Sequence, residues 1–329
     1  MKKFCRIILK SLIVVILFAV TIVLADYIVF TIEKQKMLPE VKAMLKFKYF
    51  INEPLIFMED PIDFFVDTDT IKVGGRTPDG LEYKGKMPIV VFGCSVAEGL
   101  FLKNTQTFSY KLSHILKRPV YNRAIGGGGL QHMYLQVLSK RFYDEVPPSD
   151  TIIYIFTQFH YRLLSGETWN VTDNFLYPYF ELENGKLKYA DFKNPILNYI
   201  RCSYLIRLIV QKYNNVFFFN KKNEEYLTDF VTAHFVETRN ALENNPKYKS
   251  KHIKPKMIVV FYENIFLEPI EYRRTLKKKL ESNGIMVIDT NDLGLLKYKS
   301  EYFLLYGHPS EKVWDIVTPF VAERMVQSK

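Results

Sequence analysis

Residues 88–95 read PIVVFGCS, and this stretch decides the fold. The apolar run at 88–92 ends at Gly93 and lacks the polar alternation of a strand with one wet face. Short apolar strands of this kind are typical of parallel sheets that helices cover on both faces. Ligands bind beyond the carboxyl ends of such strands. Ser95, which follows almost directly, is therefore a candidate site residue.

The same alternation of short apolar runs and amphipathic stretches continues to the end of the chain. Strands are predicted at residues 88–92, 120–124, 151–156, 257–262 and 285–289, and helices at 107–116, 130–142, 269–280 and 310–326. This pattern predicts an α/β domain over residues 86–329, with a central parallel sheet and helices on both faces. Residues at about 165–255 interrupt the alternation. They predict an insertion with two helices, at 195–212 and 224–242, that is placed to cap the site.

The N-terminal residues 1–32 predict a membrane anchor. Basic residues precede an uncharged stretch at 11–25, and the apolar run resumes after Asp26. The whole run of about 22 residues is long enough to cross a hydrocarbon core of roughly 30 Å. Basic residues ahead of it favour a cytoplasmic N-terminus and an extracytoplasmic domain. A signal peptide cleaved after Ala25 and a buried helix of a soluble protein are the alternatives. Residues 33–85 then predict a juxtamembrane helix and a loop-rich lead-in to the domain.

Composition disfavours several classes of protein. With 48% hydrophobic and 24% charged residues, the chain is an ordinary folded protein. Its formal net charge is +10, but Lys and Arg are interleaved with acids and no nucleic-acid-binding motif is present, so we expect no nucleic-acid partner. The three cysteines leave at most one disulfide, between Cys94 and Cys202. No His/Cys cluster has the spacing of a zinc site, and we expect neither a metal nor a cofactor.

Two polar segments follow the first two predicted strands. Ser95 stands at a strand-to-helix turn, where a serine presents its hydroxyl to a cleft; a serine that only caps the helix is the alternative. Four glycines at 126–129 come soon after Asn122, and free backbone N–H groups in such a loop can bind an anion. A nucleotide phosphate loop is disfavoured because the G-K-[ST] ending is missing. A connector without function remains the other alternative.

Two further segments supply histidine and amide groups. Residues 157–162 read TQFHYR, a cluster of donors at the end of the third predicted strand that is suited to completing an oxyanion hole. His308 lies between Gly307 and Pro309, directly before the last predicted helix. An imidazole held in this way can be aimed into the cleft as a general base, and a histidine in a surface turn is the alternative.

Together these blocks resemble the SGNH/GDSL hydrolase family in their order and spacing. That family has a Gly-Asp-Ser block, a glycine block, a Gly-x-Asn block and a C-terminal Asp-x-x-His. The counterparts here are Gly93-Cys94-Ser95, residues 122–129, Thr157-Gln158 and His308-Pro309. The resemblance implies a three-layer flavodoxin-like sandwich and ester hydrolysis or acyl transfer through an acyl-serine. It also implies Ser95 as nucleophile and His308 as base, with an oxyanion hole formed by the amides of Ser95 and Gly127 and by Gln158.

Three positions depart from the family pattern. Cys94 replaces the Asp beside the nucleophile, Gln158 stands where the oxyanion-hole Asn would be, and Leu305 occupies the position of the triad Asp. A Ser-His dyad remains workable because the acid mainly orients and stabilises the imidazole. Glu263 and Asp289, at the ends of later predicted strands, are candidate substitutes for the acid.

These features predict an anchored, extracytoplasmic serine ester hydrolase or O-acyltransferase. Its basic charge, its location and an aromatic share of 15% point to an acylated cell-envelope glycan or lipid as substrate. The alternative is a catalytically inactive, membrane-anchored glycan-binding or assembly protein on the same fold, and the missing acid beside His308 separates the two. A third hypothesis makes Cys94 the nucleophile, although such a thiol is usually buried and inert.

Overall fold

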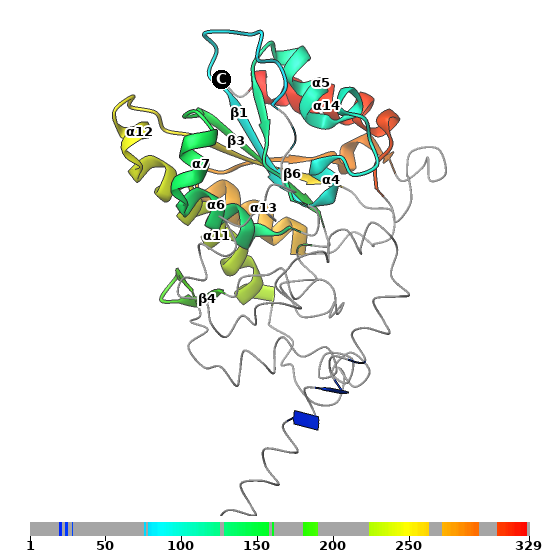
Figure 1. The fold of residues 1–329 in the computed structure, drawn as a ribbon. Helices are drawn as coiled ribbons and strands as arrows, with labels where there is room; N and C mark the ends of the chain where they lie inside the picture. Colours follow the sequence, from blue (N-terminus) through cyan, green and yellow to red (C-terminus); the bar gives the residue numbers. More distant parts are fainter. Residues whose placement is uncertain are drawn as a thin grey trace, which may run out of the picture. The chain divides into compact units, whose positions relative to one another are not determined.

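The computed structural model describes residues 76, 78–125, 128–157, 160, 180–189, 224–262, 272–295 and 308–327, together with Val20, Thr21, Leu24, Ala25 and Ile28. The described residues from Arg76 onward belong to one compact unit, and those between Val20 and Ile28 belong to a second. The first unit contains the sheet and the helices that cover it (Figure 1).

The core of this unit is a five-stranded sheet with the order β2-β1-β3-β6-β7. Its strands are β1 (Ile89–Gly93), β2 (Val120–Asn122), β3 (Thr151–Thr157), β6 (Lys256–Tyr262) and β7 (Met286–Asp289). All four neighbouring pairs are parallel. The predicted strands are thereby confirmed, and so is the flavodoxin-like α/β arrangement. In a sheet of this order, the switch point between β1 and β3 is the usual place for a ligand.

Successive side chains of each strand point to opposite faces and enter two separate cores. One core receives Val90, Phe92 and Tyr154 and is covered by α6 (Leu130–Leu138), α7 (Lys140–Glu145), α11 (Glu224–Asn244) and α13 (Tyr272–Ser282). The other receives Ile89, Val91 and Ile153 and is covered by α5 (Phe108–Leu116) and α14 (Glu311–Gln327). The two helix layers lie on opposite sides of the sheet in Figure 1. Because both faces are buried, β1 is apolar at every side chain.

The stretch predicted as helical over 130–142 is helical in the structure, with one interruption. The chain forms two helices, α6 and α7, with a break at Ser139, whose backbone is extended at φ −82° and ψ 144°. The Ser139 hydroxyl oxygen accepts a hydrogen bond from the Phe142 N–H at 3.2 Å. Serine is a favoured N-cap, and this side chain starts the second helix.

The insertion contains the predicted helix at 224–242, observed as α11, while the helix predicted at 195–212 lies outside the described residues. Phe235 and Leu242 of α11 are fully buried in the core beneath α6. α11 is therefore a covering helix of the sandwich and not part of a cap. A short helix, α12 (Pro246–Lys249), follows it. A hairpin of β4 (Phe180–Glu183) and β5 (Lys186–Tyr189) was not predicted.

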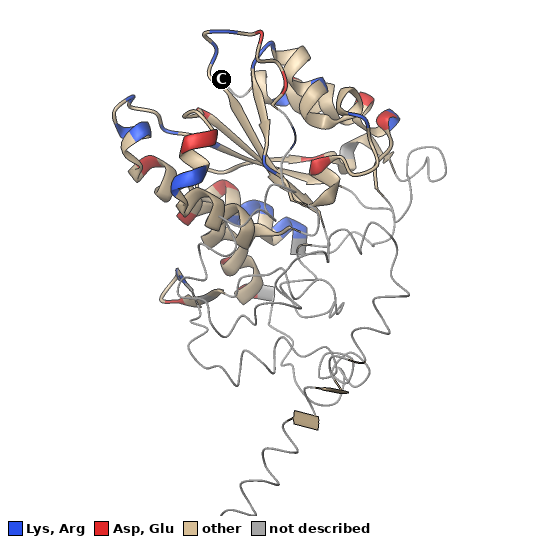
Figure 2. Ribbon diagram, viewed as in Figure 1, with Lys and Arg blue, Asp and Glu red and all other residues tan. Residues whose placement is uncertain are grey.

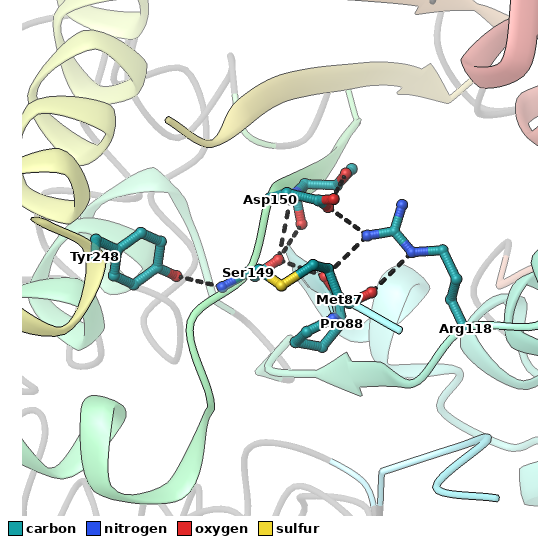
Figure 3. Close-up of polar contacts among 7 residues, drawn as sticks. Met87, Pro88, Arg118, Ser149, Asp150 and Tyr248 are labelled. Atoms are coloured by element: carbon teal, nitrogen blue, oxygen red, sulfur yellow. Dashed lines mark hydrogen bonds and ion pairs between the residues drawn. The ribbon is translucent and has the colours of Figure 1, made fainter. Parts of the chain in front are cut away.

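The amino ends of β1 and β3 are tied together by a polar cluster (Figure 3). The Arg118 guanidinium donates to the carbonyl oxygens of Met87 at 2.8 Å and Pro88 at 3.2 Å, and it pairs with the Asp150 carboxylate. The Ser149 N–H donates to the Tyr248 hydroxyl at 3.1 Å. This cluster lies at the amino ends of the strands, whereas Ser95 lies at the carboxyl end of β1. Its bonds hold β1 and β3 in register.

Residues ahead of β1 cover the free edge of β2. Asp79 and Val120 exchange both backbone hydrogen bonds, at 3.0 and 2.9 Å, and the Arg76 N–H donates to the Asn122 carbonyl at 3.2 Å. A strand edge covered in this way is protected from pairing with another chain.

Basic and acidic residues are interspersed over most of the described elements (Figure 2). Helix α13 is the most basic of the longer helices described, with five Lys and Arg residues and one Glu within YRRTLKKKLES. For the N-terminal segment, the structure describes Val20, Thr21, Leu24, Ala25 and Ile28, all helical, and the rest of the predicted anchor lies outside the described residues. Within the part of the chain that the structure describes, none of the helices combines the length and the apolarity that spanning a bilayer requires.

Candidate active site

Ser95 is the first residue of α4 (Ser95–Glu98), a one-turn helix that follows β1 almost directly. The turn depends on Gly93, which has a φ of 150°. A Cβ at this position would lie 2.7 Å from the Ala97 Cβ and 3.0 Å from the Ile155 carbonyl oxygen, so a side chain there would push α4 off the sheet. Ser95 therefore sits at the carboxyl end of β1, beside the switch point between β1 and β3, and it is partly exposed.

His308 approaches Ser95 from the other end of the chain. Its Nε2 atom lies 2.8 Å from the Ser95 Oγ, although the two residues are 213 positions apart. His308 comes just before α14, and Glu311 in the first turn of that helix accepts hydrogen bonds from Gln106 at 2.7 Å and Lys111 at 3.3 Å. These bonds fix the start of α14 against the segment that follows Ser95.

For the hydrogen bond between Ser95 and His308 to assist catalysis, the Ser95 hydroxyl must donate and His308 Nε2 must accept. For Nε2 to accept the Ser95 proton, the neutral imidazole must carry its own hydrogen on Nδ1. An oxygen so placed becomes a stronger nucleophile as its proton moves to the ring. A contact of this length is what proton transfer from a serine hydroxyl to a general base requires.

The glycine loop is braced against the end of β3 by His160, which is completely buried. The Thr157 N–H donates to the His160 Nδ1 at 3.0 Å, so Nε2 carries the hydrogen and donates to the Gly128 carbonyl at 3.2 Å. Burial lowers the pKa of His160 to about 3, so the ring is neutral. The sequence grouped His160 with the donors suited to an oxyanion hole, but its Nε2 hydrogen is used on Gly128 and its role in this structure is that of a brace.

Gly128 itself sits too tightly for any side chain. A Cβ there would lie 2.7 Å from the Ile125 carbonyl oxygen and 3.3 Å from that of Gly93. The glycine loop and the turn before Ser95 are therefore packed backbone to backbone. Of the predicted oxyanion-hole groups, Ser95 is described, and it lies where helix amides have no acceptor within the helix. Gly127 and Gln158 lie outside the described residues.

Asn122, at the end of β2, is buried and ties this turn to its surroundings. Its Nδ2 donates to the Ala97 carbonyl at 2.9 Å, and its Oδ1 accepts from the Ala124 N–H at 3.1 Å. The side chain thus holds the end of α4 and shapes the backbone that leads into the glycines. We assign it a structural role in the site.

Of the two candidate substitutes for the triad acid, the structure describes Asp289, and its side-chain partners lie in α13 and in the turn after β7. The Asp289 carboxylate accepts from the Asn291 N–H at 3.0 Å and faces Arg273 at 3.8 Å. Glu263 and Leu305 lie outside the described residues. Asp289 therefore caps the short helix η6 (Thr290–Leu293).

Cys94 is a free thiol that is 3% exposed. Burial raises its pKa, which is opposite to the shift that activates a cysteine nucleophile. This disfavours the hypothesis that Cys94 attacks the substrate. Among the described residues, no cluster of His, Cys, Asp or Glu is suited to holding a metal ion.

Two residues beside the pair were not identified from the sequence. The Phe101 ring lies 5.2 Å from the His308 ring, centroid to centroid, at an interplanar angle of 90°. The Arg76 guanidinium donates to the carbonyl oxygens of Glu98, Gly99 and Leu102, at 2.6, 2.6 and 2.9 Å. Neither residue belongs to a motif, and their contacts depend on the folded chain alone.

No protein-family model matches the chain, and no curated protein matches it. Among solved structures, a member of the lipolytic G-D-S-L family from Veillonella parvula is 11% identical, with a TM-score of 0.39, covering 72% of this chain and 97% of that one. An α/β hydrolase from the metagenome of Lake Arreo is 12% identical, with a TM-score of 0.37, covering 73% and 96%. An acetylxylan esterase from Geobacillus stearothermophilus is 12% identical, with a TM-score of 0.36, covering 72% and 93%. Similarities at this level of identity and TM-score do not assign an activity to this chain.

Proposed function

We propose that this protein is a serine ester hydrolase or acyltransferase, with Ser95 as nucleophile and His308 as general base. The observation that carries the proposal is the 2.8 Å contact between Ser95 Oγ and His308 Nε2. Both residues lie at the carboxyl-end rim of a parallel sheet, the usual location of a ligand in this fold. Gly93 and His160 support the proposal, because they hold the serine turn and the glycine loop close to each other.

The reaction follows from these positions. Ser95 Oγ attacks the carbonyl carbon of an ester as its proton passes to His308 Nε2, and the carbonyl π electrons move onto oxygen. Collapse of the tetrahedral intermediate breaks the bond to the alcohol oxygen, which takes the proton from His308 and leaves as the alcohol. Water or an acceptor hydroxyl then attacks the acyl-serine as His308 takes its proton, and collapse of this second tetrahedral intermediate breaks the bond between the acyl carbon and Ser95 Oγ, which takes the proton back from His308. The amides of Ser95 and Gly127 and the side chain of Gln158 are proposed to stabilise the oxyanion.

Covalent labelling with a fluorophosphonate probe tests this proposal most directly. The full-length protein should be labelled at Ser95, as located by peptide mass spectrometry, while Ser95→Ala should not be labelled. Labelling should be faster at higher pH, because only a neutral imidazole accepts the serine proton. Folded wild-type protein that resists labelling between about pH 6 and 9 would contradict the proposed nucleophile.

A second candidate function is a catalytically inactive binding or assembly protein on the same fold. The observation that favours it is Leu305, which stands where the SGNH/GDSL pattern has the triad Asp. Loss of that acid lowers catalysis strongly in a Ser-His-Asp triad. This candidate gives no labelling of Ser95 together with retained binding of a glycan or lipid.

We further propose that the domain is extracytoplasmic, anchored by residues 1–32, and that it acts on an acylated cell-envelope glycan or lipid. The support is the basic N-terminal tail followed by a long apolar run. A net charge of +10 would favour an anionic surface. Release of acetate from acetylated envelope glycans by the purified protein is the measurement that addresses the substrate.

A further inference from the structure

The segment that joins α4 to η4 (Asn104–Gln106) forms a tight turn that brings Phe101 beside His308. The Leu102 N–H donates to the Gly99 carbonyl at 3.0 Å, and Phe101 stands inside this turn with a φ of 71°. A bulky residue rarely adopts a positive φ, and glycine or asparagine normally occupies such a position. The turn therefore keeps an aromatic side chain where the backbone alone favours glycine.

Arg76 holds this turn in place. One guanidinium group donates to three carbonyl oxygens of the segment, those of Glu98, Gly99 and Leu102. Arginine presents its donors in a rigid fork, so the three carbonyls are fixed relative to one another. The conformation of Phe101 is consequently determined by the fold and does not depend on its own packing.

The Phe101 side chain contacts the candidate site on one side and is exposed to solvent on the other. The Phe101 ring stands perpendicular to the His308 ring, with centroids 5.2 Å apart, yet 44% of the residue remains exposed. A phenylalanine kept in an unfavourable backbone conformation and left partly open to solvent contributes little to the core. Its exposed surface lies instead beside the base of the proposed dyad.

The chemistry determines which part of a substrate comes to that surface. His308 takes the Ser95 proton and returns it to the oxygen of the departing alcohol, so the alcohol oxygen must come within hydrogen-bond reach of Nε2. The alcohol part of the ester therefore lies on the His308 side of Ser95, and the acyl part lies away from it. We infer that Phe101 is a specificity-determining residue that binds the alcohol part of the substrate, and that it selects alcohols with a flat apolar ring face, such as an aromatic or sugar ring.

This inference rests on the proposed function, and its test separates the alcohol from the acyl group. Benzyl acetate and ethyl acetate differ only in the alcohol, whereas ethyl acetate and ethyl butanoate differ only in the acyl group. The ratio of kcat/KM within each pair is measured for the wild type and for Phe101→Ala, Phe101→Gly and Phe101→Tyr. Intrinsic reactivity cancels because the same esters are compared across variants.

We expect the benzyl-to-ethyl ratio to fall about 2- to 10-fold in Phe101→Ala and Phe101→Gly, which corresponds to the loss of one aromatic contact. In Phe101→Tyr the ratio should stay at the wild-type value, because the ring is kept. The acetate-to-butanoate ratio should not change. Phe101→Gly also relieves the positive φ, so it provides a folded variant without the ring even if Phe101→Ala is unstable. If the enzyme transfers acyl groups and excludes water, the ratio is measured with the alcohols as acceptors. The rates of acetyl transfer from para-nitrophenyl acetate to benzyl alcohol and to ethanol then give the benzyl-to-ethyl ratio.

Two outcomes would overturn the inference. An unchanged benzyl-to-ethyl ratio in a folded ring-free variant means that Phe101 does not touch the alcohol. If kcat/KM falls by the same factor for every ester, so that both ratios stay unchanged, Phe101 only orients His308. Fluorophosphonate labelling of the wild type keeps the two proposals distinguishable: without labelling the proposed function fails and this inference fails with it, and with labelling the ratios decide the role of Phe101 alone.

Discussion

The His160 imidazole donates from Nε2 to the carbonyl oxygen of Gly128, 3.2 Å away, and accepts from the Thr157 N–H at 3.0 Å. One neutral ring thus joins the end of β3 to the loop between β2 and α6. Gly127, a proposed oxyanion donor, directly precedes Gly128 in the sequence, so His160 is proposed as a positioning residue that takes no part in the chemistry itself. An oxyanion hole must be fixed before the charge develops, because its advantage over water is preorganisation.

Replacing His160 should therefore slow the reaction without changing the nucleophile. We expect His160→Ala to lower kcat by about 10²- to 10³-fold, the effect of losing one oxyanion donor, with a smaller change in KM. Ser95 should still be labelled, though more slowly. Steady-state kinetics with an activated ester, alongside thermal unfolding, checks this. A loss of stability with unchanged kcat would mean that the brace is irrelevant to the site.

His160 also predicts an acid-sensitive fold. Its folded pKa of about 3 lies below the ordinary histidine value of 6.5, because burial disfavours the charged ring. The stabilisation is fully present above pH 6.5 and is lost as the pH falls toward 3, since the unfolded chain then binds a proton that the fold excludes. His160→Gln has no such group, so its stability should fall less than that of the wild type over this range. Urea unfolding at several pH values measures the difference, and parallel curves would refute it.

The two members of the proposed dyad should act as one unit. Ser95→Ala and His308→Ala should each lower ester hydrolysis by at least about 10³-fold, and the double variant should be no worse than either. Non-additivity follows because each change removes the same attack on the carbonyl. Multiplicative losses would show instead that the two residues contribute independently.

Much of the fold was predictable because β1 and its neighbours are buried on both faces. Such strands are uniformly apolar, and short apolar runs between amphipathic stretches leave few arrangements other than a parallel sheet. Ser95 and His308 could be paired across 213 positions because the carboxyl ends of parallel strands share one rim. Their catalytic role stays a prediction, whereas their contact is a feature of the structure.

The features that sequence reasoning missed fall into two kinds. The hairpin at 180–189 carried a readable signal, since Asn184 and Gly185 occupy its turn with φ values of 52° and 75°, the preferred pair for a two-residue turn. Ser139 was likewise a readable helix cap. In contrast, Arg76 and Phe101 act through contacts set by the packing of distant segments. No local pattern reports such contacts, so only the folded chain reveals them.

Arg118 offers a control that separates stability from function. Arg118→Met removes the hydrogen bonds to Met87 and Pro88 and the ion pair with Asp150 (Figure 3). These contacts lie at the amino ends of the strands, away from Ser95 at the carboxyl end of β1. We expect a loss of about 1–3 kcal/mol in the free energy of unfolding. The rate of Ser95 labelling in the folded protein should stay unchanged. A slower rate of Ser95 labelling would indicate that the amino and carboxyl ends of the strands are coupled.

The N-terminal segment yields a prediction about location. The full-length protein should stay with membranes through a high-salt or carbonate wash, because the apolar run is long enough to span the bilayer. A variant that begins at Lys34 should appear in the soluble fraction. Recovery of a soluble mature protein that begins at Asp26 would contradict the anchor and favour a cleaved signal peptide.

Replacing the buried Asp79 with asparagine should stabilise the protein at neutral pH. The side chain is 4% exposed, and of its two oxygens Oδ1 accepts from the Asn104 Nδ2 at 2.7 Å while Oδ2 is buried without a described partner. Burial raises the pKa of this carboxyl from 3.8 to about 6, although Asn104 and the nearby charges of His114 and Arg76 oppose the shift. The fold therefore prefers the protonated acid.

The sign of the effect follows from that preference. The protonated carboxyl is compatible with the fold below pH 3.8, and stability is lost as the pH rises from 3.8 to about 6, where the buried group ionises. Asp79→Asn keeps the shape and an oxygen to accept from Asn104, but it cannot ionise. It should raise the free energy of unfolding above pH 6 by roughly 3 kcal/mol at most, since each pKa unit corresponds to about 1.4 kcal/mol. Urea unfolding of both proteins at acidic and neutral pH measures this, and the gain should vanish below pH 3.8. A gain of equal size at both pH values would show that amide packing, and not the charge, is responsible.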